Sequence, residues 1–167
     1  MDAYEIRRLL PHRYPFLMVD HVLEIQVGQR CVGEKHITLN EPCYYHVVDA
    51  GPGNELRYPV SLQLESFAQV GALLVLAGRE RIDVEDEFVM LAGSVRGMKI
   101  HRDVAPGDLL RHHVHIIKEL SDTVVIGGEI RALCPGLDAS VAVAQIDSVV
   151  IAVRPRRTLF PAIETLQ

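Results

Sequence analysis

The sequence predicts an α+β fold in which an antiparallel sheet of about six strands wraps around one long central helix. The segment Pro59–Gly78 is almost wholly apolar, and its ends suit a helix, because proline is tolerated in a first turn and glycine often follows a last turn. Runs rich in Val, Ile and Leu, separated by turn residues, lie before and after this segment. A sheet of that size must bury one face, and this helix is the predicted element that covers it.

The first half of the chain is predicted from its turn residues. Residues 1–10 form a short amphipathic helix that ends before Pro11. Two β-rich runs, Phe16–Val27 and Arg30–Leu39, are joined at a hairpin. Residues 40–58 are rich in Pro, Gly and Asn and form a loop, whose length is itself a sign of function.

The second half follows the helix and a charged link at Arg79–Glu87. Four more strands are expected, separated by the turn sequences APGD, SD and PGLD: Phe88–His101, Leu109–Leu120, Thr123–Leu133 and Ala139–Val153. The tail at 154–167 is basic, broken by proline and expected at the surface. Residues 1–167 therefore form one domain, and the arrangement is that of the hot-dog fold. Its edge strands favour pairing with a second copy.

Composition excludes several classes of function. The net charge of −5 and pI near 5.9 argue against a nucleic-acid partner. Three widely spaced cysteines indicate reduced thiols in a cytoplasmic protein, with no disulfide frame and no metal site: Cys31, Cys43 and Cys134. The charged start of the chain does not resemble a signal peptide. Polar groups in the first half of the apolar segment argue against a membrane span.

Glu65 is the only ionisable side chain inside the apolar segment. Burying a carboxylate costs several kcal/mol unless it is paired or protonated, so Glu65 is the first candidate for chemistry. The alternative is a polar stripe that faces solvent and contains Gln63, Ser66 and Gln69 beside it.

Four blocks of sequence resemble the 3-hydroxyacyl-acyl-carrier-protein dehydratases of fatty-acid synthesis. They are LLPHRYPFLMVD at 9–20, HITLNEP at 36–42, LESFAQVGALL at 64–74 and LAGSVRGMKIHRDVAPGD at 91–108. The resemblance implies the hot-dog fold and a catalytic pair of His46 from the loop and Glu65 from the helix, with Gln69 supporting Glu65. It also implies an active site shared between two subunits of a homodimer or a trimer of dimers, with acyl carrier protein as partner.

The sequence departs from the family pattern around His46. The family has a compact Gly-His-Phe-Pro-Gly stretch, whereas this chain has YYHVVDAGPGNELRYP, longer by about half a dozen residues and without the flanking glycines. Val60 stands where the family has glycine. These differences leave a relocated or lost base as an alternative.

These residue types suit dehydration of a 3-hydroxyacyl thioester to the trans-2-enoyl thioester. Histidine can remove the proton beside the carbonyl, and a protonated Glu65 can release the hydroxyl as water. Backbone N–H groups at Val60 can stabilise the thioester oxygen, so no cofactor or metal is needed. Four apolar side chains of the helix are expected to line the acyl tunnel, with core packing as the alternative: Leu64, Phe67, Val70 and Leu74.

Basic residues are candidates for binding phosphopantetheine and the acidic carrier protein, with a solvated surface as their alternative. They are Arg96, Lys99, Arg102, Arg154, Arg156 and Arg157.

Other functions remain open. A hot-dog protein with a helix carboxylate can be a thioesterase or an enoyl isomerase, or a catalytically impaired subunit that supports an active partner in a hetero-oligomer. His113 and His115 share a strand face, but no carboxylate is expected near them to complete a metal site. Ser61 and Ser66 lack the motif of a serine hydrolase.

Overall fold

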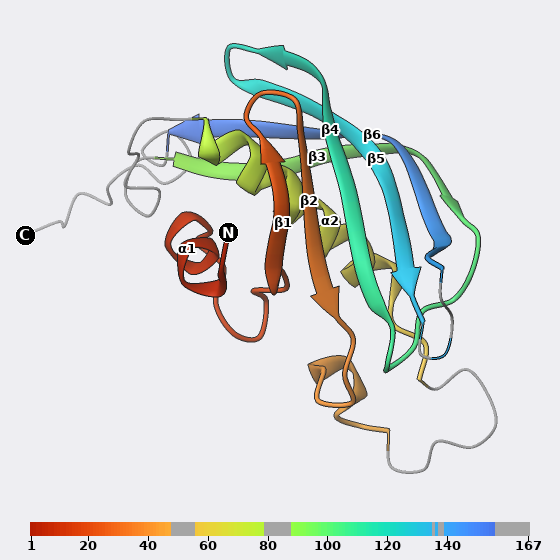
Figure 1. The fold of residues 1–167 in the computed structure, drawn as a ribbon. Coiled ribbons are helices and arrows are strands. Elements are labelled where there is room, and N and C mark those ends of the chain that lie inside the picture. The colour runs from red at the N-terminus through yellow and green to blue at the C-terminus, as the bar shows by residue number, and fades with distance from the viewer. Residues whose placement is uncertain (48–55, 79–87, 135, 137–138, 156–167) are drawn as a thin grey trace, which may run out of the picture.

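The computed structural model describes residues 1–47, 56–78, 88–134, 136 and 139–155, which form one antiparallel sheet curved around a long helix (Figure 1). In chain order the elements are α1 Ala3–Leu9, β1 His21–Gln26, β2 Arg30–His36, the 3-10 helix η1 Pro42–Tyr44, α2 Val60–Ala77, β3 Phe88–Ile100, β4 Leu109–Leu120, β5 Thr123–Leu133 and β6 Val141–Pro155. The strand order is β1-β2-β4-β5-β6-β3, so β1 and β3 are the edges. The predicted α+β fold is confirmed.

The boundaries of most elements agree with the sequence prediction, because turn residues mark them. Strands β4 and β5 begin and end where expected, and α2 lies between Pro59 as its N-cap and Gly78 as its C-cap. Two boundary predictions are wrong. Strand β1 begins at His21, not at Phe16, and residues 16–20 are a connection instead. Strand β6 also extends past Arg154, which was expected in the tail. The link at 79–87 and the tail from 156 lie outside the described residues.

Helix α2 is enclosed by the rest of the domain. It contacts β1, β2, β4, β5 and α1 (Figure 1). By length and composition alone it could cross a membrane, but most of it is buried against these elements, as in a core helix. Its polar residues Gln63, Ser66 and Gln69 are buried as well, so the interpretation that they form a solvent-facing stripe is wrong.

Two glycines let α2 approach the sheet closely. A Cβ atom at Gly33 of β2 would collide with Val70, and one at Gly71 of α2 would collide with Ile126 of β5. Protein interiors are packed too densely to absorb such an atom without movement. The helix-to-sheet distance is therefore set by the absence of side chains at these positions.

Replacing Gly71 by Ala tests this packing. Alanine usually stabilises a helix relative to glycine, by about 1 kcal/mol. Here we expect the opposite, a loss of about 1–3 kcal/mol in the free energy of unfolding, because the new methyl group overpacks the contact with Ile126. Urea unfolding of wild type and Gly71→Ala measures this difference in the free energy of unfolding. Ile126→Val, which removes the colliding methyl group, should reduce the cost of Gly71→Ala when the two are combined.

The edge strand β3 carries apolar side chains on its exposed surface. Leu91, Val95 and Ile100 are 42%, 38% and 43% exposed. Only β6 pairs with β3, so the other edge of this long strand has unpaired backbone groups within the described chain. Long, apolar edge strands are normally covered in soluble proteins because they pair readily with other strands.

Candidate active site

Glu65 lies in the second turn of α2, on the side that faces the segment between α1 and β1. Its side chain is 28% exposed in the single chain, so the carboxyl group is accessible rather than sealed in the core. Two side chains contact the same oxygen of this carboxyl group. They are Gln69, one turn further along α2, and His12, from the segment that follows α1.

Gln69 forms three hydrogen bonds, one to Glu65 and two to backbone groups. Its Nε2 donates to Glu65 Oε1 at 2.8 Å and to the Phe16 carbonyl at 2.7 Å, and its Oε1 accepts from the Met18 N–H at 2.9 Å. A backbone carbonyl only accepts and a backbone N–H only donates. The orientation of the Gln69 amide is therefore fixed by the backbone on both sides.

His12 lies close to the same oxygen of Glu65. Its Nε2 lies 3.5 Å from Glu65 Oε1, and its side chain is 30% exposed. Its Nδ1 is buried and has no hydrogen-bond partner among the described residues. Desolvation lowers the pKa of His12 and outweighs the raising effect of Glu65, which favours the neutral imidazole. Its place in the PHRYPF block was the only sequence signal for this contact.

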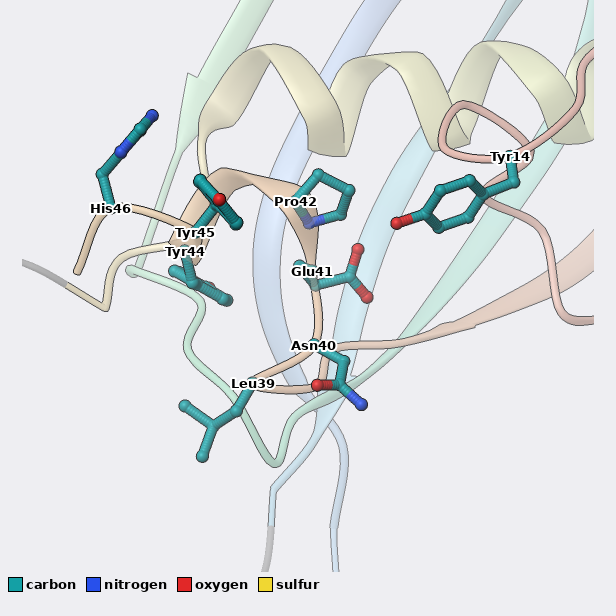
Figure 2. Close-up of a pocket in the computed structure, with 8 residues that line it drawn as sticks. All are labelled: Tyr14, Leu39, Asn40, Glu41, Pro42, Tyr44, Tyr45 and His46. Atoms are coloured by element: carbon teal, nitrogen blue, oxygen red, sulfur yellow. The ribbon is translucent and has the colours of Figure 1, made fainter. Parts of the chain in front are cut away.

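His46 lies just beyond η1 and is exposed. Its ring packs edge-on against Tyr45, with 4.9 Å between ring centroids. It helps to line an open pocket of about 430 Å³ (Figure 2). In Figure 2 the Tyr14 hydroxyl and the Glu41 carboxylate point toward each other across this pocket, whereas the His46 ring points away from both.

The structure does not bring His46 and Glu65 into contact within one chain. No hydrogen bond or ion pair between these two described side chains is present. The segment after α1 nevertheless reaches both regions, since His12 contacts Glu65 and Tyr14 lines the pocket beside His46. Residues 48–55 lie outside the described structure. Tyr44 precedes this segment and Leu56 follows it, and the Tyr44 hydroxyl donates a hydrogen bond to the Leu56 carbonyl at 3.1 Å.

The start of α2 presents free backbone donors. Pro59 caps the helix without a side-chain hydrogen bond, and the N–H groups of Val60 and Ser61 donate to no other described residue. Val60 is 43% exposed, so this end of the helix is open to a ligand in the single chain. The positive end of the helix dipole adds to the field at these donors.

The expected tunnel residues are found in two environments. Phe67, Val70 and Leu74 are fully buried in the core of the chain. Leu64 is partly buried and packs against that core. Within a single chain, three of the four expected tunnel residues therefore pack in the core.

Ser66 and His112 form a buried pair that the sequence did not reveal. Ser66 Oγ donates to the Gln63 carbonyl at 3.0 Å and lies 3.0 Å from His112 Nε2. Because the hydroxyl has only one proton, His112 Nε2–H is the donor to Ser66. Burial lowers the pKa of His112 to about 3, which keeps the ring neutral. Neither side chain is exposed, so the pair joins α2 to β4 and is no hydrolase site.

His113 and His115 lie on the outer face of the sheet, beside a hollow of about 620 Å³. The expectation that no carboxylate accompanies them is wrong, since Glu129 and Asp147 line the same hollow. Strand register brings Glu129 opposite His113, a relation across strands that spacing along the chain does not give. Within the described ranges no three His, Cys, Asp or Glu side chains are arranged to hold a metal.

The candidate basic residues differ in how they are engaged. Arg102 binds Asp108 at 2.5 Å, and Arg154 binds Asp122 at 2.6 Å. Arg96 and Lys99 are exposed on β3, and neither forms an ion pair with another described residue. Arg156 and Arg157 lie outside the described residues.

Comparison with solved structures supports the architecture. The dehydratase heterocomplex ApeI:P from Xenorhabdus doucetiae matches with a TM-score of 0.64 and 13% identity over 92% of each chain. A hot-dog-like protein from Thermanaerovibrio acidaminovorans matches with a TM-score of 0.55 and 16% identity, over 81% of this chain and 87% of that one. At these identities the matches establish the hot-dog fold alone.

Sequence comparison identifies the family. The model of the FabA-like domain matches residues 10–140. The 3-hydroxyacyl-[acyl-carrier-protein] dehydratase FabZ of Thermomicrobium roseum is 42% identical over 118 residues, which cover 71% of this chain and 74% of that protein. The chain thus belongs to the FabA-like family, among the FabZ-type dehydratases that its motifs predicted.

Proposed function

We propose that this protein dehydrates a 3-hydroxyacyl thioester, carried on acyl carrier protein, to the trans-2-enoyl thioester in fatty-acid or polyketide-type synthesis. The observation that carries the proposal is the carboxyl group of Glu65, the one charged side chain of α2, which Gln69 holds at an accessible position. A carboxylic acid in such a place is suited to donate a proton to a leaving hydroxyl group.

The reaction then proceeds by acid–base chemistry. His46 removes the proton from C2, and the electron pair of that bond forms the C2–C3 double bond. The C3–O bond breaks, its electron pair stays on oxygen, and Glu65 protonates that oxygen to give water. Proton exchange with solvent returns His46 and Glu65 to their starting states. The N–H of Val60, at the open start of α2, is the proposed donor that stabilises the negative charge on the thioester oxygen.

The active site forms between two copies of the chain. His46 and Glu65 are not in contact within one protomer, and the exposed apolar edge of β3 offers a surface for pairing. In a homodimer, His46 of one copy can face Glu65 of the other, and the exposed edge of β3 can be covered by the second copy. A trimer of dimers is a further assembly of the same unit.

The substrate is an acyl chain attached to acyl carrier protein through phosphopantetheine. Arg96 and Lys99 on β3 have charge suited to phosphopantetheine and to an acidic carrier protein. Leu64, beside Glu65, is the partly buried member of the tunnel set and the candidate to contact the acyl chain first. A substrate on acyl carrier protein supports a cytoplasmic location for the protein.

A second candidate is a catalytically impaired subunit that supports an active hot-dog partner. The orientation of His46, whose ring points away from the pocket it borders, favours this alternative (Figure 2). Such a subunit would be inactive alone and would copurify with a second hot-dog protein.

Mass spectrometry of the protein with a short 3-hydroxyacyl thioester on carrier protein separates these candidates. Wild type is expected to remove one water, and His46→Ala to do so about 10²–10⁴-fold more slowly, as for a general base. His36→Ala, which removes another exposed histidine, serves as the matched control. Release of a free thiol would identify a thioesterase. A β,γ-enoyl product formed without loss of water would identify an isomerase. No mass change at any chain length would favour the supporting subunit.

A further inference from the structure

The hydrogen bonds around Glu65 determine which of its two oxygens carries the proton. Gln69 Nε2 must donate to Glu65 Oε1, because backbone groups of Phe16 and Met18 fix the orientation of the Gln69 amide. An oxygen that accepts this bond is poorly placed to hold the acid proton itself. In the protonated form of Glu65 the proton therefore lies on Oε2.

His12 supports the same assignment. Its Nε2 lies 3.5 Å from Oε1, and its buried Nδ1 has no hydrogen-bond partner among the described residues. A buried N–H without an acceptor is rarer and more costly than an unused lone pair. The neutral ring thus carries its proton on Nε2, the ring nitrogen that lies 3.5 Å from Oε1. A distance of 3.5 Å is long for this bond, but such bonds often shorten when substrate binds.

The neutrality of His12 matters for the acid. The charged groups that influence it are Glu65 of α2 and Arg13 of its own segment. A neutral imidazole can orient the carboxyl group through its Nε2–H without placing a positive charge beside it.

We propose that His12 is a positioning residue which, in its neutral Nε2–H form and together with Gln69, reserves Oε1 of Glu65 as an acceptor and keeps the transferable proton on Oε2. The inference rests on the proposed role of Glu65 as the acid. It assigns to His12, which is not one of the two catalytic residues, the role of orienting the Glu65 carboxyl group.

Two substitutions of His12 separate positioning from packing. Glutamine keeps an N–H donor near the place of Nε2, and leucine has similar bulk without a donor. We expect His12→Leu to lower kcat about 10-fold or more with little change in KM, the size expected for loss of a hydrogen bond to an acid group. His12→Gln should retain most of the wild-type kcat. Equal losses in both variants, or full activity in His12→Leu, would overturn the proposal.

Nitrogen NMR of His12 in the wild-type protein gives a readout that does not depend on activity. An unprotonated Nδ1 and a protonated Nε2 at pH 7 are expected, and the Nε2 signal should shift in Glu65→Gln. A protonated Nδ1 would overturn the proposal even if every kinetic result agreed. If the wild type dehydrates no substrate, the proposed function fails, and the NMR tautomer still decides the hydrogen-bonding state of His12.

Discussion

Replacing Glu65 by Gln is expected to lower the rate of dehydration by about 10²–10⁴-fold, because an amide cannot supply the proton that turns the leaving hydroxyl into water. The fold should be unchanged, since the new side-chain oxygen can still accept from Gln69. Loss of water measured by mass spectrometry gives the rate, and thermal unfolding gives the stability. An active Glu65→Gln enzyme would remove the acid role from Glu65.

Mixing two inactive variants tests whether the site is shared between subunits. In a random mixture of Glu65→Gln and His46→Ala dimers, half of the dimers contain one of each, and one of their two sites is intact. About a quarter of the wild-type activity should then return, if two-fold symmetric dimers exchange freely. Each variant mixed with itself is the control. No recovery after verified exchange would place both groups in one protomer or exclude one of them.

The largest effect of pH on stability is expected from His112. Its pKa is about 3 in the folded protein against an ordinary value of 6.5, because burial disfavours the charged ring. The unfolded chain therefore binds a proton that the folded chain does not. The stabilisation is complete above pH 6.5 and is lost as the pH falls toward 3, up to about 5 kcal/mol in total.

Urea unfolding at pH 7 and pH 4.5 measures this loss. Between these values wild type should lose about 2–3 kcal/mol more than His112→Leu, in which nothing titrates at this position. Ser66 keeps its bond to the Gln63 carbonyl in that variant, so no new polar atom is stranded. His113→Gln is the matched control, because His113 is only half-buried and its lowered pKa should contribute less. Parallel pH profiles in wild type and His112→Leu would contradict the assignment.

The sequence predicted the boundaries of helices and strands better than the contacts between distant segments. Turn residues mark the ends of β4 and β5, and Pro59 and Gly78 mark α2, because these signals are local. The error at residues 16–20 has a non-local cause. That segment reads as a strand, but its carbonyl at Phe16 and N–H at Met18 bind Gln69 instead of a neighbouring strand.

The candidate site shows the same division. Glu65 stood out as the one charge in an apolar helix, and the family motif identified Gln69. The contact between His12 and Glu65 spans 53 positions, and the pairing of Ser66 with His112 spans 46. Neither follows from periodicity, because each depends on how α2 is placed against other segments. The position of His46 relative to Glu65 depends on a second chain in our proposal, which no single sequence specifies.

The three hydrogen bonds of Gln69 also limit how this protein can be re-engineered. They fasten the proton donor on α2 to the backbone of residues 16 and 18, so these pieces behave as one mechanical unit. A chimera that imports residues 9–20 from a relative would change the alignment of the acid even though Glu65 itself is untouched. Exchanges of this kind should keep residues 9–20 and the helix from the same parent.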